Sequence, residues 1–151
     1  MSHKTKFFSA FAIFMLVALA IVPTASAFEG REGDRIVIEA NEVIEDDLYV
    51  GAESLVVDGV IKGDLYVGAQ TVIINGTVEG DLVAFAQSVT INGTVGDDIR
   101  SGAAAIQLGP EAKVGDDLLF GGASLEAKSG SLVGGDILVG SAQVLVAGDT
   151  E

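Results

Sequence analysis

Aliphatic residues recur at fixed places in the chain over residues 47–151, with polar or small residues between them. The pattern is repeated six times, and the intervals between successive copies are 17, 17, 17, 19 and 19 residues. The copies begin at Asp47, Asp64, Asp81, Asp98, Asp117 and Asp136. A fixed period of this length predicts a solenoid, in which each copy forms one coil that rests on the preceding coil.

Within a copy, with its aspartate as position 1, positions 2, 9 and 11 are aliphatic, and so is the position just before the two closing residues. Positions 3 and 10 are mixed. Side chains of a strand alternate between its two faces, so the aliphatic columns are predicted to point inward and the mixed columns outward. Position 11, for example, holds Val57, Ile74, Ile91, Leu108, Ala127 and Val146.

Each coil is therefore predicted to contain three short strands and three corners, which makes the chain an all-β, single-stranded β-helix of about six coils. Glycine, Asn-Gly and Asp-Gly mark the corners, where residues that tolerate positive φ are expected. The two longer coils place their extra residues at one corner, in residues 109–113 and 127–132. Asn-Gly also favours hairpins, so an antiparallel meander is the alternative, although a meander does not require the repeat.

The two ends of the solenoid differ in sequence. Residues 33–46 are predicted to form a partial coil within an N-terminal cap of residues 28–46, with Ile36, Ile38 and Val43 covering the core. We expect no such cap on the last copy, which begins at Asp136. Exposed strand edges template pairing with another chain, so self-association is predicted at this end. The residues assigned to it are Ile137, Val139, Val144, Leu145 and Val146.

Residues 1–27 have the features of a secretory signal peptide. Lys4 and Lys6 precede an apolar run over residues 7–22, and Ala25-Ser26-Ala27 is a small-x-small cleavage site. Cleavage after Ala27 would export the chain to the cell envelope or the medium. The alternative is an uncleaved anchor that holds the protein in a membrane by residues 7–22.

The length of 151 residues indicates one repeat domain behind the leader, and the net charge is −14. Loss of the leader would leave six basic and 22 acidic residues, a net charge of −16. Such a surface repels nucleic acid and anionic lipid. The chain has no cysteine, and its single histidine is His3, so disulfides, thiolate zinc sites and cysteine nucleophiles are excluded.

The aspartates at position 1 are the only ionisable column that recurs in every copy. We expect each carboxylate to accept a backbone N–H at its corner, with no metal and no cofactor; a row of calcium ions is the alternative. A polysaccharide hydrolase or lyase needs two carboxylates in different environments, whereas this column repeats one environment, so no catalytic residue is predicted. Tyr49 and Tyr66 are expected to stack on an outer face, as packing or as a sugar platform.

The repeat G-D-L-x-V-x-A-x-S/T-V-x-I-N-G-T-V resembles that of the bactofilin-like, polymer-forming β-helical proteins. The similarity is greatest to their secreted or envelope relatives, in which a leader precedes an acidic cap; the cap here ends E-V-I-E-D-D-L-Y-V over residues 42–50. The resemblance implies a right-handed β-helix without enzymatic activity that assembles with itself into filaments or scaffolds. The alternative function is a monomeric extracytoplasmic module that binds a cation or a glycan.

Overall fold

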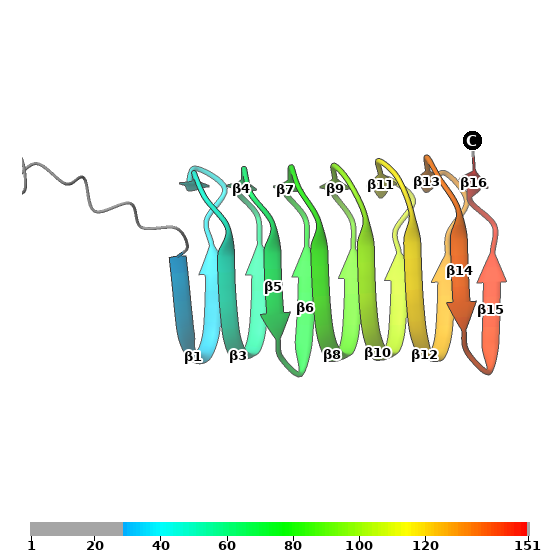
Figure 1. The fold of residues 1–151 in the computed structure, drawn as a ribbon, viewed down its shortest axis with the longest axis horizontal. Helices are drawn as coiled ribbons and strands as arrows, with labels where there is room; N and C mark the ends of the chain where they lie inside the picture. The colour runs from blue at the N-terminus through cyan, green and yellow to red at the C-terminus, as the bar shows by residue number, and fades with distance from the viewer. Residues whose placement is uncertain (1–28, 151) are drawn as a thin grey trace, which may run out of the picture.

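The computed structural model describes residues 29–150, and every element in that range is a β-strand. The strands wind into a parallel β-solenoid of about seven turns, stacked along the long axis of the molecule (Figure 1). The predicted signal peptide lies outside the described residues. Within residues 29–150 there is no helix that could span a membrane.

Two parallel sheets run along the solenoid. The larger sheet contains β1 (Glu29–Ile38), β3 (Leu48–Val57), β5 (Leu65–Gly68), β6 (Thr71–Ile74), β8 (Leu82–Ile91), β10 (Ile99–Leu108), β12 (Leu118–Ala127), β14 (Ile137–Gly140) and β15 (Gln143–Val146). The second sheet contains β2 (Val43–Ile44), β4 (Val60–Ile61), β7 (Thr77–Val78), β9 (Thr94–Val95), β11 (Lys113–Val114), β13 (Leu132–Val133) and β16 (Asp149–Thr150).

The strand register confirms the predicted repeat. Leu65 pairs with Leu48 one period of 17 residues earlier, and Leu118 pairs with Ile99 one period of 19 residues earlier. Every strand pairing among the described residues is parallel, which excludes the antiparallel meander. Equivalent residues of successive copies therefore lie above one another.

The first turn is longer than the predicted partial coil. β1 pairs with β3 from Glu29 onward and β2 pairs with β4, so this turn is complete. The prediction that Val43 points inward is wrong, because Val43 is 46% exposed and Ile44 is buried in its place. Ile44 aligns with Ile61, which belongs to the inward column just before the closing residues.

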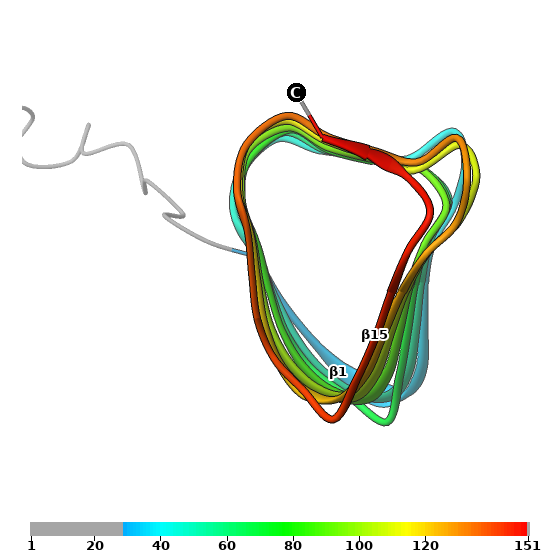
Figure 2. The same ribbon diagram turned by 90° about the vertical axis from the view of Figure 1, so that its right-hand side faces the viewer.

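The first predicted corner is a bend within a strand. In five turns one ten-residue strand continues through it, and only in the turns of β5 and β6 and of β14 and β15 is the strand interrupted. Seen along the axis, the turns superpose as a three-sided outline (Figure 2). Three sides per turn are therefore present, but most turns have two strands rather than three.

The aliphatic columns form the core, as predicted, and the side chains at positions 2, 9 and 11 are buried through the turn of β12. One inward column, at position 4, was missed because its residues differ in size and polarity. It contains Val50, Val67, Ala84, Ser101, Phe120 and Val139. The large ring of Phe120 follows two small residues, and the buried Ser101 hydroxyl has no hydrogen-bond partner among the described residues.

The corner glycines have a different role from the predicted one. Among the described residues, only Gly130 has a positive φ, at 97°. At Gly76 and Gly93 a Cβ atom would lie well inside van der Waals contact with the carbonyl oxygen of a residue one turn earlier, Gly59 and Gly76 respectively. Glycine at these corners therefore permits close stacking of the turns.

The two longer coils carry their extra residues where the sequence predicted. Leu108 and Lys113 pair with Ala127 and Leu132, and the segments between these strand positions form a short outward loop in each turn. The first turn has a loop at the same corner, and the three loops project together from the outline (Figure 2). Each loop is closed by a hydrogen bond from an N–H to a carbonyl three residues earlier, at 2.8 to 3.1 Å.

Candidate functional site

The six aspartates at position 1 form a continuous ladder that runs along the solenoid, where each aspartate directly precedes a strand of the larger sheet. In each step the Oδ1 atom of one aspartate accepts the backbone N–H of the next ladder aspartate, at 2.8 to 3.0 Å. The donors are Asp64, Asp81, Asp98, Asp117 and Asp136. The predicted hydrogen bonds from backbone N–H groups are confirmed for the first five carboxylates, and they tie each turn to the next.

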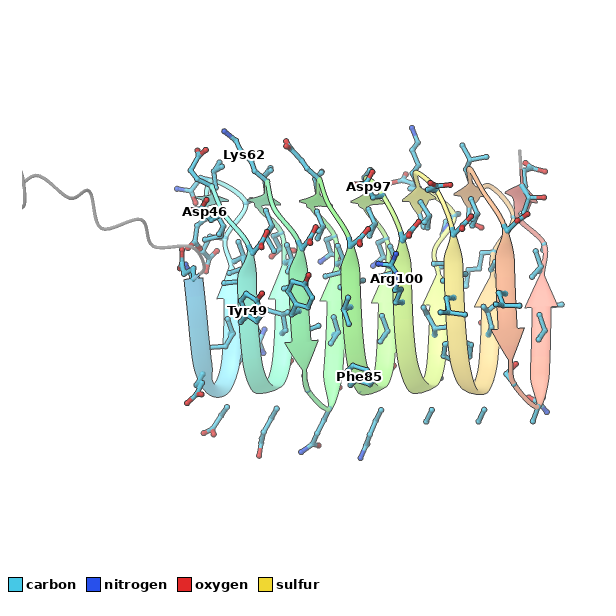
Figure 3. All side chains as sticks on the ribbon, viewed as in Figure 1. Asp46, Tyr49, Lys62, Phe85, Asp97 and Arg100 are labelled. Atoms are coloured by element: carbon cyan, nitrogen blue, oxygen red, sulfur yellow. The ribbon has the colours of Figure 1, made fainter. Side chains whose placement is uncertain are left out.

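Among the described residues, the second carboxylate oxygens of the ladder have side-chain partners only at Asp64, Asp81 and Asp98. Arg100 donates from Nη1 to Asp81 Oδ2 and from Nη2 to Asp98 Oδ2, both at 2.5 Å. One turn closer to the N-terminus, the Tyr66 hydroxyl donates to Asp64 Oδ2 at 3.1 Å. Arg100 and Tyr49 project from the same side of the sheet (Figure 3).

Arg100 also sets the protonation of its partner. Burial by itself would raise the pKa of Asp81, but the hydrogen bonds from Arg100 and from the Asp98 N–H, with the guanidinium charge, hold the pKa of Asp81 below its usual value. The hydrogen bond to Asp64 raises the pKa of the Tyr66 hydroxyl. Asp81 therefore stays ionised and paired with Arg100 at neutral pH.

The ladder is crowded with negative charge nearer the C-terminus. Repulsion from Asp117, with smaller effects of desolvation and of Asp98, Asp97 and Asp136, raises the pKa of Asp116. Within residues 29–150, the ion pairs of the ladder involve only Asp81 and Asp98, so Asp117 and Asp136 have no cationic partner. The part of the ladder at Asp117 and Asp136 therefore carries negative charge that no cation of the described residues neutralises, and it is called the unbalanced half.

Carboxylate oxygens of Asp98, Asp116 and Asp117 lie within 4.8 Å of one another, close enough to share a metal ion. Two observations favour a structural role instead. Asp98 already accepts the Asp117 N–H at 3.0 Å through Oδ1 and bonds Arg100 through Oδ2. Both carboxylate oxygens of Asp98 thus accept hydrogen bonds, and the charge of the Arg100 guanidinium lowers the affinity of Asp98 for a second cation.

Removal of divalent metal should leave stability unchanged. Because the ladder carboxylates are held by backbone N–H groups, dialysis against EDTA is expected to keep the thermal midpoint within experimental error of the untreated protein. The measurement is circular dichroism at increasing temperature, before and after addition of calcium. A midpoint that falls by several degrees with EDTA and returns with calcium would show that Asp98, Asp116 and Asp117 hold a metal.

Tyr49 and Tyr66 stack on each other, with ring centroids 4.7 Å apart and planes 9° from parallel. One face of each ring is therefore used within the pair, which fits the predicted cross-strand packing. Phe85 lies nearer the bend, 66% exposed (Figure 3). A shallow groove passes between these aromatic side chains, with Gly51 and Gly68 in its lining.

The two ends of the core differ in chemistry. At the N-terminal end, Arg31 occupies position 4, an inward column, and its Nη2 bonds Glu29 Oε1 at 2.7 Å and Glu42 Oε1 at 2.5 Å. At the other end, Val144 and Val146 are 52% and 43% exposed, although their columns are buried in earlier turns. An ion-paired cluster therefore covers one end, whereas aliphatic side chains are exposed at the other.

The register separates the predicted self-association residues into two groups. Ile137 and Val139 align with Leu118 and Phe120, and Val144 and Val146 align with Leu125 and Ala127, which are all buried. Leu145 aligns with Glu126 in an outward column and is 62% exposed. Four of the five residues thus lie at the end of the core, and Leu145 lies on a side of the solenoid.

Arg31 and Arg100 are the functional residues that the sequence prediction missed. Each breaks its column: Arg31 is a charge in an otherwise inward column, and Arg100 is the one basic residue at position 3. Arg100 follows Asp98 by two residues, and Asp98 directly precedes β10, so in the extended chain both side chains point to the same side. That spacing was the signal for an ion pair with the ladder.

The fold and the ladder define a parallel β-solenoid whose turns are linked by a hydrogen-bonded row of aspartates. No protein-family model, curated protein or solved structure matches the chain. Function must therefore be inferred from the chemistry of the solenoid surface and its ends.

Proposed function

We propose that this chain is a non-enzymatic structural protein of the cell envelope, which assembles with itself through the ends of its β-solenoid. The observation that carries the proposal is the apolar end of the core, where Val144 and Val146 are exposed and Ile137 and Val139 are only partly buried. In the described part of the chain, β14 and β15 pair on one side only, with β12. A second copy would continue both the strand pairing and the aliphatic columns.

The N-terminal end is less suited to such stacking. Charged side chains that point inward are a known protection of sheet edges against pairing, and Arg31 has that position here. The hydrogen bond to Glu42 raises the pKa of Arg31, and the Arg31 guanidinium lowers the pKa of Glu42, so the ion pair persists at neutral pH. The contrast favours association through the C-terminal turn.

Two features of the sequence support an extracytoplasmic scaffold. The first 27 residues resemble a cleavable leader, and the repeat resembles that of the bactofilin-like proteins, which polymerise. The ladder uses the recurring carboxylates for cohesion between turns, which favours a structural role over catalysis.

A lysine in the exposed core column should abolish association. The test uses the chain from Phe28, which contains every described strand, and its Val146→Lys variant. Stacking would bury the lysine ammonium without a partner, so we expect the variant to be monomeric where the parent protein forms dimers or larger species at micromolar concentration. Light scattering measures the mass, and circular dichroism checks that the β-structure remains.

Leu145→Lys is the matched control, because it adds the same charge one residue away but in an outward column. It should associate like the parent protein. If the parent protein is monomeric at high concentration, the assembly proposal fails and a monomeric binding module replaces it. If both variants dissociate equally, the contact involves the side of the solenoid rather than the end of its core.

A further inference from the structure

A groove lined by both charged and aliphatic side chains lies along the unbalanced half of the aspartate ladder. Its lining contains Asp98, Asp117 and Asp136 of the ladder and, two residues further along the chain from each aspartate, Arg100, Leu119 and Leu138. Leu119 and Leu138 are 44% and 67% exposed, so two large aliphatic side chains face solvent next to a row of carboxylates.

The same chain shows which side chain can bind beside the aspartates of such a groove. Arg100 is at position 3, two residues after Asp98, and its guanidinium bridges Asp98 to Asp81 of the preceding turn, at 2.5 Å to each. Leu138 has the same position relative to Asp136 and to Asp117 one turn earlier, because its register continues that of Arg100 through Leu119. The Arg100 guanidinium lies between Asp81 and Asp98, whereas no cation of the described residues lies between Asp117 and Asp136.

We propose that this groove docks an arginine side chain from a basic, amphipathic segment of a partner protein. The guanidinium would bridge Asp117 and Asp136 as Arg100 bridges Asp81 and Asp98, and the aliphatic stem would lie across Leu119 and Leu138. Charge complementarity selects the partner: the chain has a net charge of −14, and the groove adds apolar surface to its negative charge. A second copy brings the same excess of acidic residues to its side faces, so it is a poor occupant.

Binding of a synthetic peptide tests the proposal. The probe is an acetylated hexapeptide of alternating leucine and arginine, and the control peptide has citrulline, a neutral isostere, at each arginine. Isothermal titration with the chain from Phe28 at low ionic strength should detect the arginine peptide only. Loss of one charge-assisted contact should weaken the affinity roughly tenfold, and added salt should weaken it further.

Asparagine variants remove the charge and retain the fold. The side-chain carbonyl in Asp117→Asn can still accept the Asp136 N–H, a bond of 2.8 Å in the structure. Asp117→Asn and Asp136→Asn should therefore each lose roughly tenfold in peptide affinity with an unchanged thermal midpoint. Asp47→Asn, at the other end of the ladder, should bind like the parent protein.

Leu138→Arg supplies the missing cation within the chain. Its guanidinium should occupy the site and abolish binding of the peptide, whereas Leu138→Met should bind as before. Equal binding of the citrulline peptide, or full affinity in Asp117→Asn and Asp136→Asn, would overturn the proposal. Displacement of the peptide by micromolar calcium would overturn it as well, because the carboxylates would then form a metal site.

Discussion

Ile74→Asp should lower the free energy of unfolding by at least ~3 kcal/mol, because it places an unpaired carboxylate in the closed core. Ile74 is fully buried in the position 11 column and lies between Val57 and Ile91 of the neighbouring turns. These neighbours are aliphatic, so no donor is available to the new carboxylate. Urea denaturation monitored by circular dichroism measures the loss as a lower midpoint.

Ile73→Asp is the control, with the same substitution one residue earlier in β6. Ile73 lies in an outward column between Val56 and Thr90, where the carboxylate can keep its contact with water. The midpoint should change by less than a third of the change in Ile74→Asp. Equal midpoints for the two variants would contradict the assignment of inward and outward columns.

The core was predictable because the alternation along each strand and the repeat from turn to turn select the same residues. A residue such as Ile74 is aliphatic in a column that alternates with tolerant positions, and the same choice recurs in every copy. The inward direction of positions 2, 9 and 11 and the parallel register followed from this repetition alone. The inward direction of position 4 was not predicted, because Ala84, Ser101 and Phe120 are all buried but differ in hydrophobicity and size.

The length of the first turn was underpredicted for a related reason. Its strand includes Glu29 and Arg31, which stand where the next copy has Leu48 and Val50, so the repeat was not visible there. Arg31 forms ion pairs with both Glu29 and Glu42 at the end of the core. A pattern search based on hydrophobicity misses a turn whose inward positions are charged.

The sequence predicted the aspartate column and its hydrogen bonds to backbone N–H groups, but not how the charge of the column is balanced along the solenoid. The sequence places an aspartate in every coil, and the structure shows that Oδ1 links the turns while Oδ2 points to position 3. The residue at position 3 then decides the local balance: Tyr66 and Arg100 satisfy the ladder, and Leu119 and Leu138 do not. One repeated column thus provides cohesion throughout and a candidate binding surface in one half.

Gly93→Ala should destabilise the solenoid by about 2–4 kcal/mol, because the turns stack too closely for a side chain at this corner. A Cβ atom at Gly93 would overlap the carbonyl oxygen of Gly76 in the preceding turn. The corner cannot move away freely, because Gly93 N donates to Ile74 O and Thr94 N donates to Gly76 O, each at 3.0 Å. Relief of the clash would break hydrogen bonds that link two turns.

Gly68→Ala is the control, and the expected change has the opposite sign. No atom lies within 4 Å of a Cβ atom built at Gly68, and this glycine does not have a positive φ. Alanine there restricts the unfolded chain without strain, so stability should rise by about 0.4–1 kcal/mol. Urea midpoints of the two variants decide between steric and conformational reasons for glycine in this fold. A loss of stability in Gly68→Ala as large as that in Gly93→Ala would show that strand flexibility, rather than contact between turns, requires glycine at both positions.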